Sequence, residues 1–124
     1  MTTKPKKGGD FTELAILPVR ETVLFPNAIL PLTVGRESSL KLVNDLPEEG
    51  KFIGVVTQRD PRVDNPQPTD LYQIGTVAFV HKIIKLPSQS LFIFVEGLQR
   101  IAVEEVYQFD PFLRAKVKPL PDNE

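Results

Sequence analysis

Apolar residues along the chain fall into short runs separated by proline, glycine and polar residues, a pattern typical of β-strands. Leu14–Val19 is the first such run, and Pro18 should halt it. Ala28–Val34 is the second extended segment. Because Pro31 inside it has no N–H to donate, this strand should lie at a sheet edge or carry a bulge. Residues 51–58 return to the strand pattern.

The longest predicted strands lie in the second half of the chain. Residues 72–86 and 90–106 form a predicted hairpin, joined by the tight turn Pro-Ser-Gln. Both faces of Leu91–Val95 are apolar, so this strand should be central in its sheet. Residues 112–118 then alternate cleanly between apolar and basic side chains. This alternation predicts a final strand with one buried face and one solvated face.

Only one stretch has the spacing of a helix. Leu40, Val43 and Leu46 recur at three-residue intervals. Glu37 complements the positive end of the helix dipole, and Pro47 bars continuation of the helix. Several strands with glycine and proline turns, plus a single helix, predict a mainly β fold. We expect a pseudo-barrel of twisted antiparallel sheets with one short α-helix.

The chain has 124 residues, the size of one domain. Residues 1–11 are polar, basic and glycine-containing, and they predict a disordered leader. The C-terminal stretch has two closely spaced prolines and then only polar residues, so 120–124 should begin a linker. The domain itself is then expected to span 12–119. The loop Arg59–Asp70 carries prolines and mixed charges, and we interpret it as solvated.

Charge and composition disfavour several function classes. The formal net charge is −1, so no overall basic field attracts nucleic acid or an anionic membrane. No apolar run approaches the roughly 18 residues of a membrane span. The lack of cysteine fits a cytoplasmic protein, and with His81 as the single histidine it predicts no metal site and no catalytic residues. A binding module that needs no cofactor is the expectation.

The stretch Phe94–Arg100 places a carboxylate and a guanidinium on either side of a glycine. In a regular strand Glu96 and Arg100 share a face, but their Cβ atoms lie roughly 13 Å apart, too far for an ion pair. Gly97 between them indicates a bulge or a close approach of backbone. We interpret all three residues as structural. Glu96 should hydrogen-bond backbone, and Arg100 should pair with a distant carboxylate or extend to the barrel rim.

Three segments together carry a family resemblance. Residues 14–43 combine Leu-Pro-Val-Arg, a Val-Leu-Phe-Pro turn and Ile-Leu-Pro-Leu running into Val-Gly-Arg-Glu. Residues 70–87 contain Ile-Gly-Thr-Val and a Leu-Pro turn, and residues 91–106 contain Val-Glu-Gly-Leu-Gln-Arg. In this order and spacing the chain resembles, from Leu14 to Pro119, the N-terminal domain of Lon, the ATP-dependent bacterial protease.

The resemblance implies a PUA-like pseudo-barrel that selects and holds unfolded or degron-bearing polypeptides. In full-length members a helical region, an AAA+ ATPase and a Ser-Lys protease domain follow, and a hexameric ring assembles. This chain contains no Walker motif and no proteolytic Ser-Lys element, so neither activity carries over to it. ATP and Mg²⁺ are expected only in the ATPase domain. The alternative is a stand-alone PUA-like domain that binds RNA or another protein.

Large apolar residues near turns are the candidates for substrate binding. They are Phe25, Pro26, Ile84, Leu86 and Pro87. Burial under the sheet rim is an equally good interpretation. The functional alternative is a shallow apolar patch that captures exposed hydrophobic segments of unfolded proteins. An extended peptide added to the edge strand Ala28–Val34 is a second possible mode.

The remaining charged groups give only weak indications of function. Arg114, Lys116 and Lys118 form a basic stripe that would be the footprint of RNA binding, together with the lysines of the leader. The negative net charge argues against nucleic acid as a partner. The acidic pairs Glu48-Glu49 and Glu104-Glu105 are interpreted as solvated. A small hydrolase has almost no support, because no nucleophile and base can be named.

Overall fold

The computed structural model describes residues 13–20, 22–46, 51–63 and 66–120. The predicted leader, Pro47, Glu48-Glu49 and most of the predicted linker lie outside these residues. The elements in chain order are β1 (Glu13–Val19), β2 (Ile29–Val34), α1 (Glu37–Asn44), β3 (Phe52–Thr57), the 3-10 helix η1 (Pro68–Asp70), β4 (Ile74–Lys85), β5 (Leu91–Gln108) and β6 (Arg114–Pro119).

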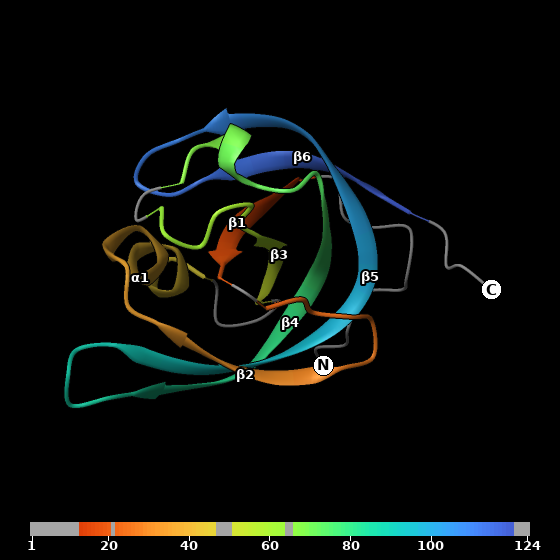
Figure 1. Cartoon of the computed structure of the whole chain (residues 1–124). Helices are drawn as coiled ribbons and strands as arrows, with labels where there is room; N and C mark the ends of the chain where they lie inside the picture. Colours follow the sequence, from red (N-terminus) through yellow and green to blue (C-terminus); the bar gives the residue numbers. More distant parts are fainter. Residues whose placement is uncertain (1–12, 21, 47–50, 64–65, 121–124) are drawn as a thin grey trace.

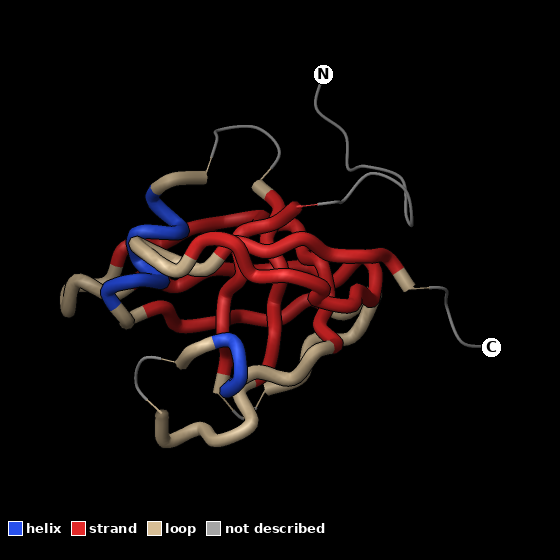
Figure 2. Tube along the Cα trace, turned by 90° about the horizontal axis from the view of Figure 1, so that it is seen from above, coloured by secondary structure: helices blue, strands red, loops and turns tan. Residues whose placement is uncertain are grey.

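The strands form one curved sheet in the order β2-β5-β4-β3-β1-β6, and β6 also pairs with β5. This second pairing closes the sheet into a barrel, with α1 beside the strands at one end (Figures 1 and 2). The predicted mainly β barrel with one helix is therefore confirmed. One pairing departs from the antiparallel expectation, because β1 and β3 run parallel. The connection that contains β2 and α1 is long enough for such a crossover.

β5 is the central strand, as predicted, and it has two halves. The first half, Leu91–Glu96, pairs with β2 on one side and with β4 on the other. The second half, Leu98–Gln108, pairs with β6 from Ile101 onward and thereby closes the barrel. β2 pairs only with β5 among the described strands, so the edge position expected from Pro31 is confirmed.

Two hydrophobic cores lie on opposite faces of the sheet. Strand alternation in β1 shows the division, since Leu17 and Val19 belong to the first core and Leu14 and Ile16 to the second. Pro18 does not halt β1, which continues to Val19. A proline is tolerated inside a strand where its nitrogen faces away from the neighbouring strand.

The helix covers the first core with residues that the spacing argument only partly identified. Leu42 and Val43 are its buried apolar side chains, whereas Leu40 is only partly buried. Leu46 packs against the same core from just beyond the helix. Intervals of three residues follow only one row of side chains on a helix. The apolar face that α1 buries is wider than one row, so it also includes Leu42.

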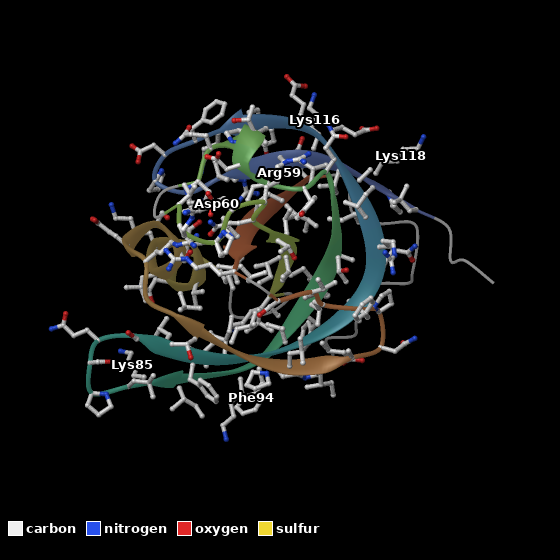
Figure 3. All side chains as sticks on the ribbon, viewed as in Figure 1. Arg59, Asp60, Lys85, Phe94, Lys116 and Lys118 are labelled. Carbon is white, nitrogen blue, oxygen red and sulfur yellow. The ribbon has the colours of Figure 1, made fainter. Side chains whose placement is uncertain are left out.

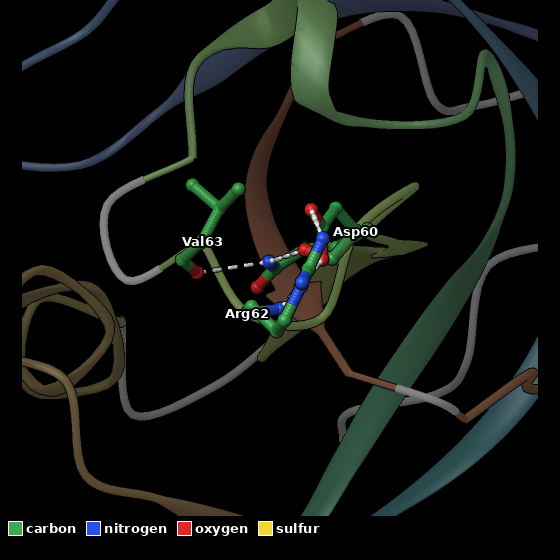
Figure 4. A network of polar contacts seen from close by, with 4 residues as sticks. Asp60, Arg62 and Val63 are labelled. Carbon is green, nitrogen blue, oxygen red and sulfur yellow. Dashed lines mark hydrogen bonds and ion pairs between the residues drawn. The ribbon is translucent and has the colours of Figure 1, made fainter.

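Buried Gln58 organises the loop that begins at Arg59. Its Nε2 donates to the carbonyl oxygens of Asp60 and Val63, each at 3.0 Å (Figure 4). Its Oε1 accepts a hydrogen bond from Arg36, next to α1. Within the loop the Arg62 guanidinium donates to the Asp60 carboxylate and lowers its pKa, and the Arg62 backbone N–H adds to this effect. The start of this predicted solvated loop is therefore ordered by a buried amide.

Candidate functional site

The five residues predicted to bind substrate lie in two places. Phe25 has 54% of its surface exposed and precedes β2, where the N–H of Asn27 donates to the carbonyl of Gly97 at 2.8 Å. Leu86 and Pro87 lie at the tip of the β4–β5 hairpin, where the N–H of Leu86 donates to Ser90. These places are at opposite ends of the β2–β5 pairing, so the five residues do not form one patch.

A continuous face of the sheet connects the two ends. We define the outer face as the side chains that point away from the first core on β2, β5 and β4. In the rows that β2 forms with β5 and β4, they are Ile29, Pro31, Thr33, Phe92, Phe94, Glu96, Phe79, Lys82 and Ile84. Cross-strand register places them in rows, with Pro31 opposite Phe94 and Phe94 opposite Lys82. Figure 3 shows Phe94 pointing away from the barrel.

The outer face is rich in exposed apolar surface. Ile29 is 61% exposed, and Ile84 is exposed beside the hairpin tip. The rings of Phe92 and Phe94 meet edge to face, with centroids 5.3 Å apart, and both side chains are half-buried. The sequence signal was the apolar character of both faces of Leu91–Val95. That signal predicts a central strand, which the pairing confirms, but it does not indicate that the outer side chains stay accessible.

Glu96 lies at the end of the outer face and contacts a histidine. His81 Nε2 is 2.7 Å from Glu96 Oε1, and the His81 ring meets the edge of Phe79 with centroids 4.8 Å apart. A second titratable group therefore stands beside Glu96, supplied by the neighbouring strand. The sequence interpretation, which looked only nearby in the chain, gave His81 no role. The contact places a polar pair at one border of the apolar surface.

Gly97 has the structural role that the sequence predicted. The register between β4 and β5 shifts beside it, and its N–H donates to the carbonyl of Ala28 at 2.8 Å. A Cβ at this position would overlap the carbonyl oxygen of Phe25. Arg100 lies beyond the shift, opposite Thr76, and forms no ion pair with any described carboxylate. Glu96 and Arg100 therefore do not form an ion pair with each other.

The family model described as "ATP-dependent protease La (LON) substrate-binding domain" matches residues 13–124. The chain belongs to this family. It is 58% identical over 113 residues to the Lon protease of Koribacter versatilis, which covers 91% of this chain and 14% of that protein. It is 44% identical over 109 residues to the Lon protease of Dictyoglomus thermophilum, covering 88% of this chain and 14% of that protein. The chain thus spans about one seventh of the length of these curated relatives.

Solved structures of Lon N-terminal domains share the fold. The Lon N-terminal domain protein of Xanthomonas campestris superposes with a TM-score of 0.69 at 22% identity, over 92% of this chain and 63% of that one. The N-terminal domain of the Lon protease of Mycobacterium avium complex gives a TM-score of 0.62 at 16% identity, over 90% and 56% of the two chains. The barrel described above is therefore the fold of Lon N-terminal domains.

The basic stripe of this LON-family domain is interleaved with acidic and aromatic groups. Lys116 Nζ lies 3.9 Å from Glu105 Oε1, and Arg114 Nε donates to the Tyr107 hydroxyl at 3.4 Å. The same hydroxyl donates to Glu13. Lys116 and Lys118 lie on the side of the barrel opposite Phe94 (Figure 3). A continuous cationic track for a phosphate backbone is not formed by these residues.

Among residues 13–20, 22–46, 51–63 and 66–120, no group of three or more His, Asp or Glu side chains is placed to hold a metal ion. Neither helical segment of that part is long and apolar enough to cross a membrane. Because it gathers accessible apolar side chains from three strands, the outer face is the candidate functional site of this LON-family domain.

Proposed function

We propose that this domain captures unfolded or degron-bearing polypeptides on its outer face, for degradation by a Lon protease. The observation that carries the proposal is the set of accessible apolar side chains that runs diagonally across three strands: Ile29, Phe94, Phe92 and Ile84. Contiguous apolar surface on a small soluble domain is typical of an interaction site. Phe25 at one end and Leu86 at the other extend this surface. Its length suits an elongated polypeptide.

The chemistry of degradation belongs to other parts of the parent protein. The relatives are Lon proteases about seven times as long as the matched segment. Within such a cytoplasmic protein, this domain binds substrate without catalysing a reaction and without a cofactor. ATP and Mg²⁺ act in the ATPase domain. A shallow apolar face binds each segment weakly, and several copies held in a hexameric ring gain by avidity.

Binding of an unfolded protein tests the proposal directly. Fluorescein-labelled lactalbumin, reduced and carboxymethylated, is titrated with the 124-residue chain and followed by anisotropy beside the native, folded form. We expect saturable binding of the unfolded form only. Equal binding of both forms, or binding of neither, would contradict the proposed function.

Two isoleucine variants locate the binding surface. Ile29→Ser removes an exposed apolar side chain from the outer face. Ile74→Ser makes the same change on β4 at a position that is 44% exposed and lies outside the outer face. We expect the first variant to weaken binding of unfolded lactalbumin and the second to leave it unchanged. Equal loss in both would show that general surface hydrophobicity, and not the outer face, binds the polypeptide.

A further inference from the structure

A groove separates the free edge of β2 from the end of β1. Its volume is about 510 Å³. One wall is formed by the consecutive residues Leu17–Arg20, and the other by the consecutive residues Pro31–Gly35. Successive residues of a strand point to opposite faces, so a groove lined by all of them runs along the strand edge. We call this groove the seam.

The seam is the part of the barrel that β6 does not close. β6 pairs with β1 only at Glu13–Ala15, and the N–H of Ile16 makes the last bond, to the carbonyl of Leu113 at 2.8 Å. Beyond that point β1 has β3 on one side and the seam on the other. Two strand edges therefore face one another across an open cavity.

Hydrogen bonds on the far sides of both strands show which backbone groups face the seam. On β2, the bond from Gly97 to the carbonyl of Ala28 starts the ladder with β5. Alternation then directs the backbone groups of Leu30, Leu32 and Val34 toward β5 and those of Pro31 and Thr33 toward the seam. Pro31 has no N–H, but because its backbone faces away from β5, no hydrogen bond between β2 and β5 is lost.

The same alternation places a proline on the opposite wall. The carbonyl of Val19 accepts a bond from the N–H of Gln58 at 2.9 Å, so Val19 faces β3. Its neighbour Pro18 then faces the seam, in phase with Ile16, which bonds to Leu113 on that side. Each wall thus offers carbonyl acceptors at its proline, and Thr33 adds both an acceptor and a donor.

Buried apolar side chains line the seam beneath these edges. Leu17, Val19, Leu32 and Val34 all belong to the first core and line the cavity. A strand lying between the two walls would direct every second side chain toward them. Polar residues, among them Thr22 and Thr33, line the remainder. The seam therefore matches a ligand with extended backbone and alternating apolar residues.

We propose that the seam holds an extended segment of the substrate polypeptide, apolar at every second residue, through backbone hydrogen bonds. This inference rests on the proposed function. Edges of two strands are complemented by extended backbone, which is how strand-addition sites bind peptides. The seam also continues the outer face, because Pro31 and Thr33 contribute side chains to the outer face and backbone to the seam. Its volume lies within the roughly 300–1,000 Å³ of ligand sites.

Pro18 and Pro31 keep this binding weak and reversible. Each removes one donor from the wall it occupies, so an inserted strand forms fewer bonds than in a complete sheet. Proline on an exposed edge is also a device that discourages permanent pairing with another chain. A recognition domain must release what it holds, and the two prolines serve that requirement.

Labelled heptapeptides and a proline variant test the inference. The probe is fluorescein-labelled Thr-Val-Thr-Val-Thr-Val-Thr, compared with a peptide of the same composition whose valines are consecutive, and with an alternating peptide N-methylated at every second residue. We expect the unmodified alternating peptide to bind the 124-residue chain most tightly. Pro31→Ala restores one donor and should tighten this binding about threefold to tenfold, the ratio for one hydrogen bond. Pro119→Ala, on β6 opposite Ile101, should leave it unchanged.

Equal binding of the N-methylated and unmodified peptides, or no change in Pro31→Ala, would overturn the inference. Sedimentation of Pro31→Ala without peptide supplies a further outcome: a dimer would identify a second copy of this chain, and not substrate, as the partner of the β2 edge. The lactalbumin titration separates the two proposals. If Ile29→Ser still weakens lactalbumin binding while the peptides show no preference, the proposal for the outer face is supported and the proposal for the seam is contradicted.

Discussion

The two halves of β5 belong to one strand but differ on their outer sides. Each half buries an isoleucine completely on the side that faces a core, which we call its inner side: Ile93 in the first core, and Ile101 in the second core on the other face of the sheet. Beyond Gly97, where β6 closes the barrel, the outward positions include the exposed carboxylates Glu104 and Glu105. Before Gly97, where the sheet ends at edge strand β2, the outward positions carry Phe92 and Phe94. The first half of β5 therefore presents two adjacent aromatic rings outward, whereas the second half presents carboxylates among its outward side chains.

This contrast separates stability from binding within a single strand. Inner side chains of both halves hold the cores, so their loss should unfold the domain wherever they lie. Outer side chains of the first half contribute less to the cores and are available to a ligand. Variants on the two sides of β5 should therefore affect different measurements.

The largest effect is expected from the inner sides. Ile93→Ala and Ile101→Ala each remove a fully buried side chain and leave a cavity. Each should lower the free energy of unfolding by about 2–5 kcal/mol, measured by urea denaturation. Similar losses would confirm that the two inner sides are equivalent. A harmless Ile93→Ala would instead place the stability of the barrel in the second half alone.

Gly97 at the boundary should give the next largest effect. In Gly97→Ala the new Cβ overlaps the carbonyl oxygen of Phe25, so backbone must shift. We expect a loss of about 1–3 kcal/mol in urea denaturation, the usual cost of overpacking. Gly35→Ala is the matched control, because its Cβ would meet Ser90 Oγ at an ordinary 3.5 Å. Equal stability of the two variants would contradict a required close approach at Gly97.

Local chemistry explains why much of the fold could be predicted from the sequence. Pro31 has no N–H in any fold, so an edge strand or a bulge followed directly, and the strand lies at the edge. Gly97 inside an apolar run indicated a close backbone approach, and the approach is to Phe25. The alternation of residues 112–118 predicted β6, because a half-buried strand repeats every two residues. Each of these signals depends only on a residue and its immediate neighbours.

Features that depend on which strands meet could not be predicted in this way. The contact between His81 and Glu96 joins residues fifteen apart through the β4–β5 pairing. The outer face needs the registers of β2, β5 and β4 together, and so Ile29, Phe92 and Phe94 were not among the candidates. The parallel pairing of β1 and β3 depends on the path of the chain through α1. No local pattern carries this information.

A change at Phe94 should weaken binding and leave stability nearly unchanged, the reverse of the effect expected at Ile93 and Ile101. Phe94→Ser removes a half-buried ring from the centre of the outer face. We expect binding of unfolded lactalbumin to weaken about fivefold to tenfold, as for a central interface aromatic. The free energy of unfolding should fall by only about 1 kcal/mol. Phe109→Ser, at an aromatic that is 56% exposed elsewhere, is the control and should bind normally. A stability loss as large as that of Ile93→Ala would remove the distinction between the two sides.

The smallest effect is expected from Asp60, whose contact with Arg62 touches neither half of β5 and so gives a baseline for both. The Arg62 side chain, and then its backbone N–H, lower the pKa of Asp60 below the ordinary 3.8. A lowered folded-state pKa means that the contribution is fully present above the ordinary value and is lost as pH falls through the folded-state value. Asp60→Asn should therefore be slightly less stable than the native chain in urea denaturation at pH 6. This loss of stability should vanish below the folded-state pKa. Because the pair is exposed, salt should reduce the difference at pH 6 as well. If the native chain instead gained stability relative to Asp60→Asn as pH falls, ionised Asp60 would be destabilising. The contact with Arg62 could then not serve as the baseline.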